Sequence, residues 1–212
     1  MRKLSVLTAL TIALLVIVGC TKKEPPKPVT PPAPPPPTAA EIAQQIRGQI
    51  TPLIAQGATP AVKAQLLSAL QSAKTTHSVT DNGKQALSTI KSEVEEQVKQ
   101  TFDQKRWAMC MALCDAVDIL DPGNQRVARY KERATIEFNK PQVKLQGFLT
   151  DETTKAVYAY LEIYLPETGK TEHKQVQENE EFLGLRFVEI IGDLKGIKLE
   201  YRKTGETYDV MK

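Results

Sequence analysis

The sequence contains few of the residues on which enzymes most often build an active site. Its 212 residues include only two histidines, three cysteines and one tryptophan. The GxSxG, HExxH, P-loop and GxGxxG patterns of hydrolases, metalloproteases and nucleotide-binding proteins are absent. His77 and His173 lie in different predicted segments, and the acidic run at Glu178, Glu180 and Glu181 is typical of a solvated turn. We therefore predict that the chain is not an enzyme and has no catalytic residue, cofactor or small-molecule substrate.

The chain also lacks a large excess of charge of either sign. The formal net charge is +3, and Arg2 and Lys3 supply +2 of it, which leaves +1 on the remainder. This balance gives no electrostatic basis for a nucleic-acid partner. The hydrophobic content of 41% and the charged content of 25% are ordinary for a globular protein.

The N-terminus has the three parts of a bacterial export signal. Two basic residues precede an apolar stretch, residues 4–18, that is shorter than the roughly 20 residues of a membrane-spanning helix. The following Ile17-Val18-Gly19-Cys20 resembles the lipobox of bacterial lipoproteins. The resemblance implies that residues 1–19 are a signal peptide, that cleavage precedes Cys20, and that this cysteine carries diacylglycerol and an N-acyl chain. The alternatives are an uncleaved single-span anchor and a plain secretory signal.

The next segment, residues 20–37, is predicted to be a stiff linker. It contains nine of the 14 prolines of the chain. Proline fixes φ and removes a backbone donor, so the segment favours an extended polyproline II spacer on the order of 50 Å long. The expected localisation is the bacterial cell envelope, with a lipid anchor and the body in the periplasm. Thr21 after the cysteine favours the outer membrane by the enteric sorting rule, so the choice of membrane stays open.

Residues 38–139 are predicted to form a helical domain. Thr38 and Glu41 match a capping box, and apolar residues then recur at helical spacing. We expect Pro52 to bend or divide the first helix, and residues 75–83 to form a loop. In total about five helices, paired as hairpins, are expected; they cover residues 38–57, 59–74, 84–102, 105–120 and 125–138.

Within this domain, residues 106–124 resemble the second helix of a tetratricopeptide repeat. Trp107 and Pro122 stand at its aromatic and closing-proline positions. At most about one and a half repeats are visible, against the three that a solenoid needs, so the pattern predicts helical hairpins and no peptide-binding superhelix. Cys110 and Cys114 lie four residues apart, and without further ligands at a suitable spacing we predict no metal site. We interpret them as small buried hydrophobic residues; the alternative is a disulfide, which export permits but which would strain the helix.

At residue 141 the hydrophobic period changes from 3.6 to 2. Residues 156–166 alternate clearly, with apolar side chains on one face and Tyr158, Tyr160 and Tyr164 on the other. About six short strands separated by turn signals predict a small β-sandwich or open barrel over residues 141–212. The predicted fold class is therefore α+β. The three tyrosines either form a partner surface or cover a second layer of structure, such as the helices.

The order of signals in residues 141–212 resembles the β-domain of PilP-type pilus assembly lipoproteins and of the type II secretion protein C homology region. The matching steps are a hydrophobic-Xaa-Gly step at Leu145 to Gly147, an apolar-Gly-apolar step around Gly184, and an apolar strand starting at Gly196. The resemblance implies a structural protein that couples inner-membrane pilus subunits to the secretin. The alternative hypothesis is a generic outer-membrane lipoprotein adaptor with a helical protein-interaction domain.

Overall fold

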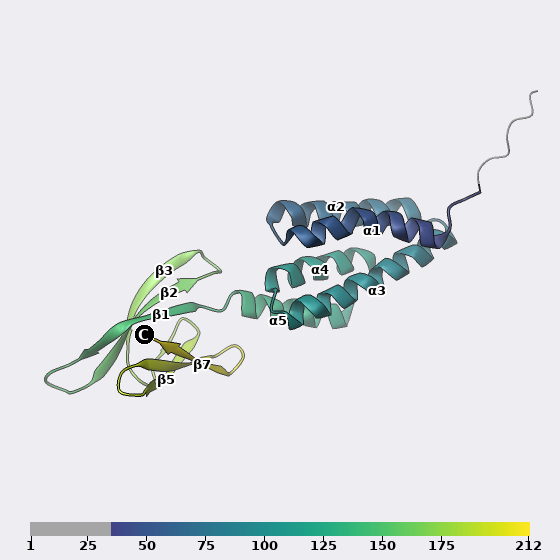
Figure 1. The fold of residues 1–212 in the computed structure, drawn as a ribbon. Helices are drawn as coiled ribbons and strands as arrows, with labels where there is room; N and C mark the ends of the chain where they lie inside the picture. The colour runs from purple at the N-terminus through teal and green to yellow at the C-terminus, as the bar shows by residue number, and fades with distance from the viewer. Residues whose placement is uncertain (1–34) are drawn as a thin grey trace, which may run out of the picture. The chain divides into compact units, whose positions relative to one another are not determined.

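The computed structural model describes residues 35–212, which form five helices followed by seven strands (Figure 1). The expected signal peptide, the lipidation site Cys20 and nearly all of the proline-rich linker lie outside the described residues. The α+β class is confirmed, with the helices first and the strands second. The helices are α1 (Ala39–Gln56), α2 (Pro60–His77), α3 (Asp81–Asp103), α4 (Trp107–Leu120) and α5 (Gln125–Phe138).

Four of the five helices in residues 35–212 begin at a residue whose side chain caps them, whereas α4 begins after Arg106 without such a cap. Thr38 accepts a hydrogen bond from the backbone N–H of Glu41, whose carboxylate bonds back to the Thr38 N–H, so the predicted capping box is present. The side-chain oxygens of Thr59, Thr80 and Asn124 cap α2, α3 and α5 by accepting a backbone N–H of the first turn, without a reciprocal bond.

Pro52 does not divide α1, which runs unbroken past it. Proline removes the hydrogen bond to the carbonyl four residues earlier, which belongs to Gly48. Both residues are exposed, so water can solvate the carbonyl that loses its partner.

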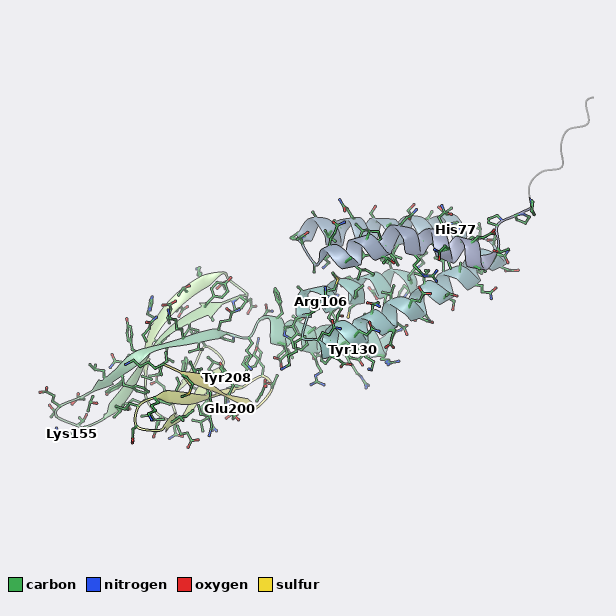
Figure 2. The ribbon with its side chains drawn as sticks, in the orientation of Figure 1. His77, Arg106, Tyr130, Lys155, Glu200 and Tyr208 are labelled. Atoms are coloured by element: carbon green, nitrogen blue, oxygen red, sulfur yellow. The ribbon has the colours of Figure 1, made fainter. Side chains whose placement is uncertain are left out.

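The predicted loop over residues 75–83 is wrong: only residues 78–80 separate α2 from α3. Gly83 belongs to the first turn of α3, where its N–H bonds to the Thr80 hydroxyl at 3.1 Å. A Cβ at this position would lie 1.9 Å from the carbonyl oxygen of His77, at the end of α2 (Figure 2). The glycine therefore permits a close approach of two helices; it does not mark a loop.

The helices pack in two layers around one apolar core (Figure 1). α1 packs against α2 and α3, and α2 also packs against α4. In turn, α4 packs against both α3 and α5. Leu70, Ile90, Val98 and Leu113 are fully buried at the centre of this core. Around it, Phe102 packs edge-on against Trp107 and Tyr130, with ring centroids 5.2 and 5.0 Å apart.

The strands form two antiparallel sheets, one of three strands in the order β1-β2-β3 and one of four in the order β4-β5-β6-β7. The two sheets share a single core, to which both contribute fully buried residues, and β1 contacts β7. The seventh strand beyond the expected six is the two-residue β4. The strands are β1 (Gln142–Thr150), β2 (Val157–Leu165), β3 (Lys170–Val176), β4 (Glu181–Phe182), β5 (Leu185–Ile191), β6 (Gly196–Tyr201) and β7 (Glu206–Met211).

The last turn of α5 is bonded to the four-stranded sheet. The Tyr201 hydroxyl donates to the carbonyl of Ile136 at 3.1 Å, and Ile136 packs against the core of the sheets. Lys140 pairs with Glu206 at 3.0 Å and lies 4.2 Å from the ring centre of Tyr208 in β7 (Figure 2). Burial raises the pKa of Tyr208 to about 12, so this phenol is neutral at physiological pH.

Candidate protein-interaction surface

The alternation predicted for β2 is present, and it separates a core face from an outer face. Ala159, Leu161 and Ile163 are fully buried between the sheets. On the opposite side, Tyr160 is 47% exposed and Tyr164 is 40% exposed. Two of the three predicted partner-surface residues, Tyr160 and Tyr164, are therefore partly open to solvent, and Tyr164 borders a hollow that Trp107 of α4 and Phe138 of α5 also line.

Tyr158 is half-buried on the same outer face, and Leu149 lies directly opposite it on β1. Leu149 is 57% exposed, which is unusual for so large an aliphatic side chain. We use the name tyrosine face for the outer-face set of Leu149, Tyr158, Tyr160, Tyr164 and His173.

A β-bulge places Leu149 on the tyrosine face. Val143 and Leu145 pair with core residues of β2, but the register shifts between Leu145 and Gly147. After the shift, Phe148 takes the inward position and Leu149 the outward one, because one extra residue exchanges the two faces of a strand. Sequence reasoning missed Leu149, although a glycine inside a strand is a signal for a bulge.

One ring stack and one side-chain hydrogen bond lie on this face. Tyr160 lies opposite Gly147, which has no side chain to cover the ring, and stacks on His173 with 6.2 Å between the ring centres. Gln146 donates to the carboxylate of Glu162 at 2.6 Å, which fixes the acidic group between the tyrosines. Tyrosine has few rotatable bonds, so it loses little side-chain entropy when a partner binds.

A hollow in the helical part lies between α1 and α3. It has a volume of about 350 Å³ and an apolar floor that includes Ile50, Ile54 and Val94. At its rim, Arg47 holds Glu93 through two hydrogen bonds of 3.0 and 2.6 Å. This groove could receive an apolar segment of another protein.

Cys110 and Cys114 are free thiols with almost no exposure. Their mutual hydrogen bond and their burial raise the pKa of the Cys114 thiol well above its usual range, so it stays protonated. Cys110 also donates weakly to the Val98 carbonyl at 3.7 Å. In the described part of the chain, no group of three histidine, cysteine or acidic residues is placed to hold a metal ion.

Charged side chains between the helices are arranged as structural ion pairs. Asp115 on α4 bonds to Lys63 of α2 at 2.5 Å and to Lys131 of α5 at 2.6 Å. Burial opposes ionisation, but the hydrogen bonds from Lys131 and Lys63 outweigh it and hold the pKa of Asp115 below its ordinary value. Asp115 thus links α4 to both α2 and α5 through ion pairs.

Comparison with protein-family models, with curated proteins and with solved structures found no match for this chain. Over residues 35–212, no helix has both the length and the apolarity needed to cross a membrane. The tyrosine face is the largest set of exposed apolar side chains that neighbouring strands bring together in this part of the chain.

Proposed function

We propose that the chain is a lipid-anchored structural component of the bacterial envelope that presents the tyrosine face to a protein partner. The observation that carries this proposal is the joint exposure of Leu149, Tyr160 and Tyr164 on one face of a sheet whose other face contributes to the core between the sheets. Tyrosine is enriched in protein interfaces because it combines a large apolar ring with a hydroxyl and has few rotamers to lose.

The sequence supports the remaining parts of the proposal. The lipobox at Cys20 and the proline-rich segment after it support an anchor and a standoff that hold the folded body away from the bilayer. The likeness of residues 141–212 to PilP-type β-domains supports a pilus or type II secretion machine as the host. The partners in that case are inner-membrane pilus subunits and the periplasmic part of a secretin.

The groove between α1 and α3 supports the second candidate, an adaptor whose helical part receives another envelope protein. Its floor residues Ile50 and Val94 already belong to the core, so an inserted side chain would gain apolar contact mainly from the half-buried Ile54. In this candidate the tyrosine face has no secretin partner.

Site-specific photo-crosslinking in living cells separates the two candidates. A photoreactive residue replaces Tyr160 in one variant and Thr51, which lines the groove, in another. A third variant at Glu132, exposed on α5, reports random contacts. We expect the Tyr160 variant to capture a secretin or an inner-membrane pilus subunit. Capture at Thr51 with none at Tyr160 would favour the adaptor, and equal capture at Glu132 would contradict both.

A further inference from the structure

β3 presents a free backbone edge. In the order β1-β2-β3 it is the outer strand, and β2 is its main neighbour among the described elements. All seven of its residues pair with β2 in continuous register, from Lys170 opposite Leu165 to Val176 opposite Ala159. The edge is therefore straight, without a bulge that would prevent another strand from pairing with it.

The hairpin geometry fixes which backbone groups point outward. The Leu165 carbonyl accepts hydrogen bonds from the N–H groups of Thr168 and Gly169, so it points into the β2–β3 hairpin. At the opposite end of β2, the Ala156 carbonyl accepts from Asp151, so the even-numbered residues of β2 face β1. The odd-numbered residues of β2, which include Leu165, therefore form the hydrogen-bonded pairs with β3.

It follows that the N–H and C=O groups of Thr171, His173 and Gln175 point away from β2. These three residues also carry exposed side chains on the outer face. The alternate residues, Glu172 and Lys174, are half-buried on the core side, and neither has an ion-pair partner among residues 35–212.

We propose that this edge pairs with the same edge of a second copy of the chain, antiparallel and centred on His173. The two His173 residues then face each other as a hydrogen-bonded pair, and Thr171 of each copy faces Gln175 of the other. Glu172 of each copy lies opposite Lys174 of the other, which supplies two opposite-charge pairs from groups that lack partners in the single chain. The interface is isologous, as twofold symmetry requires.

The charge pattern selects this register. The two β3 strands could also slide along each other and still form backbone hydrogen bonds. The smallest such slide moves the centre of the pairing from His173 to Glu172 or Lys174. Centred on Glu172, the pairing sets two glutamates against each other and sets Lys170 against Lys174; centred on Lys174, it sets two lysines against each other. Like charges directly opposite destabilise strand pairing, so the symmetric register centred on His173 is the favoured one.

The pairing goes beyond the proposed function and is argued from the geometry and charges of β3; only the effect of membrane confinement rests on the proposed lipid anchor. The twofold axis of an antiparallel edge pairing runs perpendicular to the sheet, so both tyrosine faces lie on the same side of one continuous sheet. Each His173 already stacks on its own Tyr160, and the pairing would place four rings in a row. Confinement to a membrane surface would raise the local concentration and favour so small an interface.

Disulfide trapping in the full chain tests the register. A His173→Cys variant brings the two new thiols together, since the Cα atoms of a hydrogen-bonded pair lie about 5.5 Å apart, within disulfide range. The matched control is Gln175→Cys, on the same face of the same strand and equally exposed. In the proposed register its two copies lie about 13 Å apart along the strands, too far to bridge.

We expect a reducible dimer from His173→Cys and none from Gln175→Cys. Equal cross-linking of the two variants, or cross-linking of neither, overturns the proposal. A cross-link from position 173 only to a different protein overturns the assignment of a second copy as the occupant. The native cysteines are present in both variants, so any cross-link that they form appears equally in both.

Charge exchange gives a second test without added thiols. Glu172→Lys alone and Lys174→Glu alone should each weaken self-association about tenfold, because two cross-strand pairs change from attraction to repulsion. Mixing the two single variants restores opposite charges at both pairs, so native mass spectrometry should show the mixed dimer in excess over either homodimer. The double variant should regain homodimers. A mixture without excess mixed dimer contradicts the register.

Discussion

The close approach of α2 and α3 at Gly83 makes a quantitative prediction for Gly83→Ala. The added Cβ would lie 1.9 Å from the His77 oxygen, whereas real Cβ contacts stay beyond 3.0 Å, so backbone must move by at least 1.1 Å. Overpacking of this kind costs typically about 1–3 kcal/mol. The higher helix propensity of alanine offsets at most about 1 kcal/mol of this cost. We expect Gly83→Ala to lower the free energy of unfolding by about 1–2 kcal/mol.

Gly48→Ala is the matched control. Gly48 also lies inside a helix, but nothing is within 4 Å of the position that its Cβ would occupy. With no steric cost, we expect this substitution to raise the stability by about 0.5–1 kcal/mol.

Urea denaturation followed by tryptophan fluorescence measures both variants. Trp107 is the only tryptophan and lies in the helical part, so its signal reports the unfolding of the helices. If Gly83→Ala is as stable as Gly48→Ala, the proposed role of the glycine in helix packing is wrong.

Two further predictions concern buried ionisable groups. The pKa of Asp115 is lower in the folded than in the unfolded state, so its stabilising contribution is present above the unfolded value of about 3.9 and is lost as the pH falls through the folded value. The free energy of unfolding should therefore fall less steeply with decreasing pH in Asp115→Asn than in the unsubstituted chain. An equally steep fall in both would contradict the roles of Lys63 and Lys131. Cys110 and Cys114 should resist a thiol reagent in the native chain and react after denaturation. Rapid labelling of the folded protein would show that they are accessible.

Local patterns predicted the elements well where one physical signal dominated. The alternation of β2 set its two faces, and Thr38 with Glu41 set the start of α1. These features depend on neighbouring residues in the chain, so they can be read without knowledge of the tertiary structure.

The errors arose where a glycine or a proline acts through tertiary contacts or solvent. Gly83 resembles a loop residue in sequence, but its space is occupied by the end of another helix. Gly147 permits a bulge, and the bulge moves Leu149 from the core to the tyrosine face. Whether a strand contains such a shift depends on its neighbour, which a single strand pattern does not specify.

The self-pairing edge was not predictable from sequence for a similar reason. The charge symmetry of residues 170–176 is visible in the sequence, but it has no meaning until the order β1-β2-β3 places β3 at the edge. Only the hairpin closure then shows that the backbone groups of His173 point outward.

The proposed function requires a lipid on Cys20 that fixes this body to a bacterial membrane. Mass spectrometry of the N-terminal peptide, from protein extracted from its own envelope, detects this lipid. We predict a chain that begins at Cys20, with diacylglycerol on the sulfur and an acyl group on the new N-terminus. An unmodified cysteine, in a chain released without detergent, would contradict the proposed function.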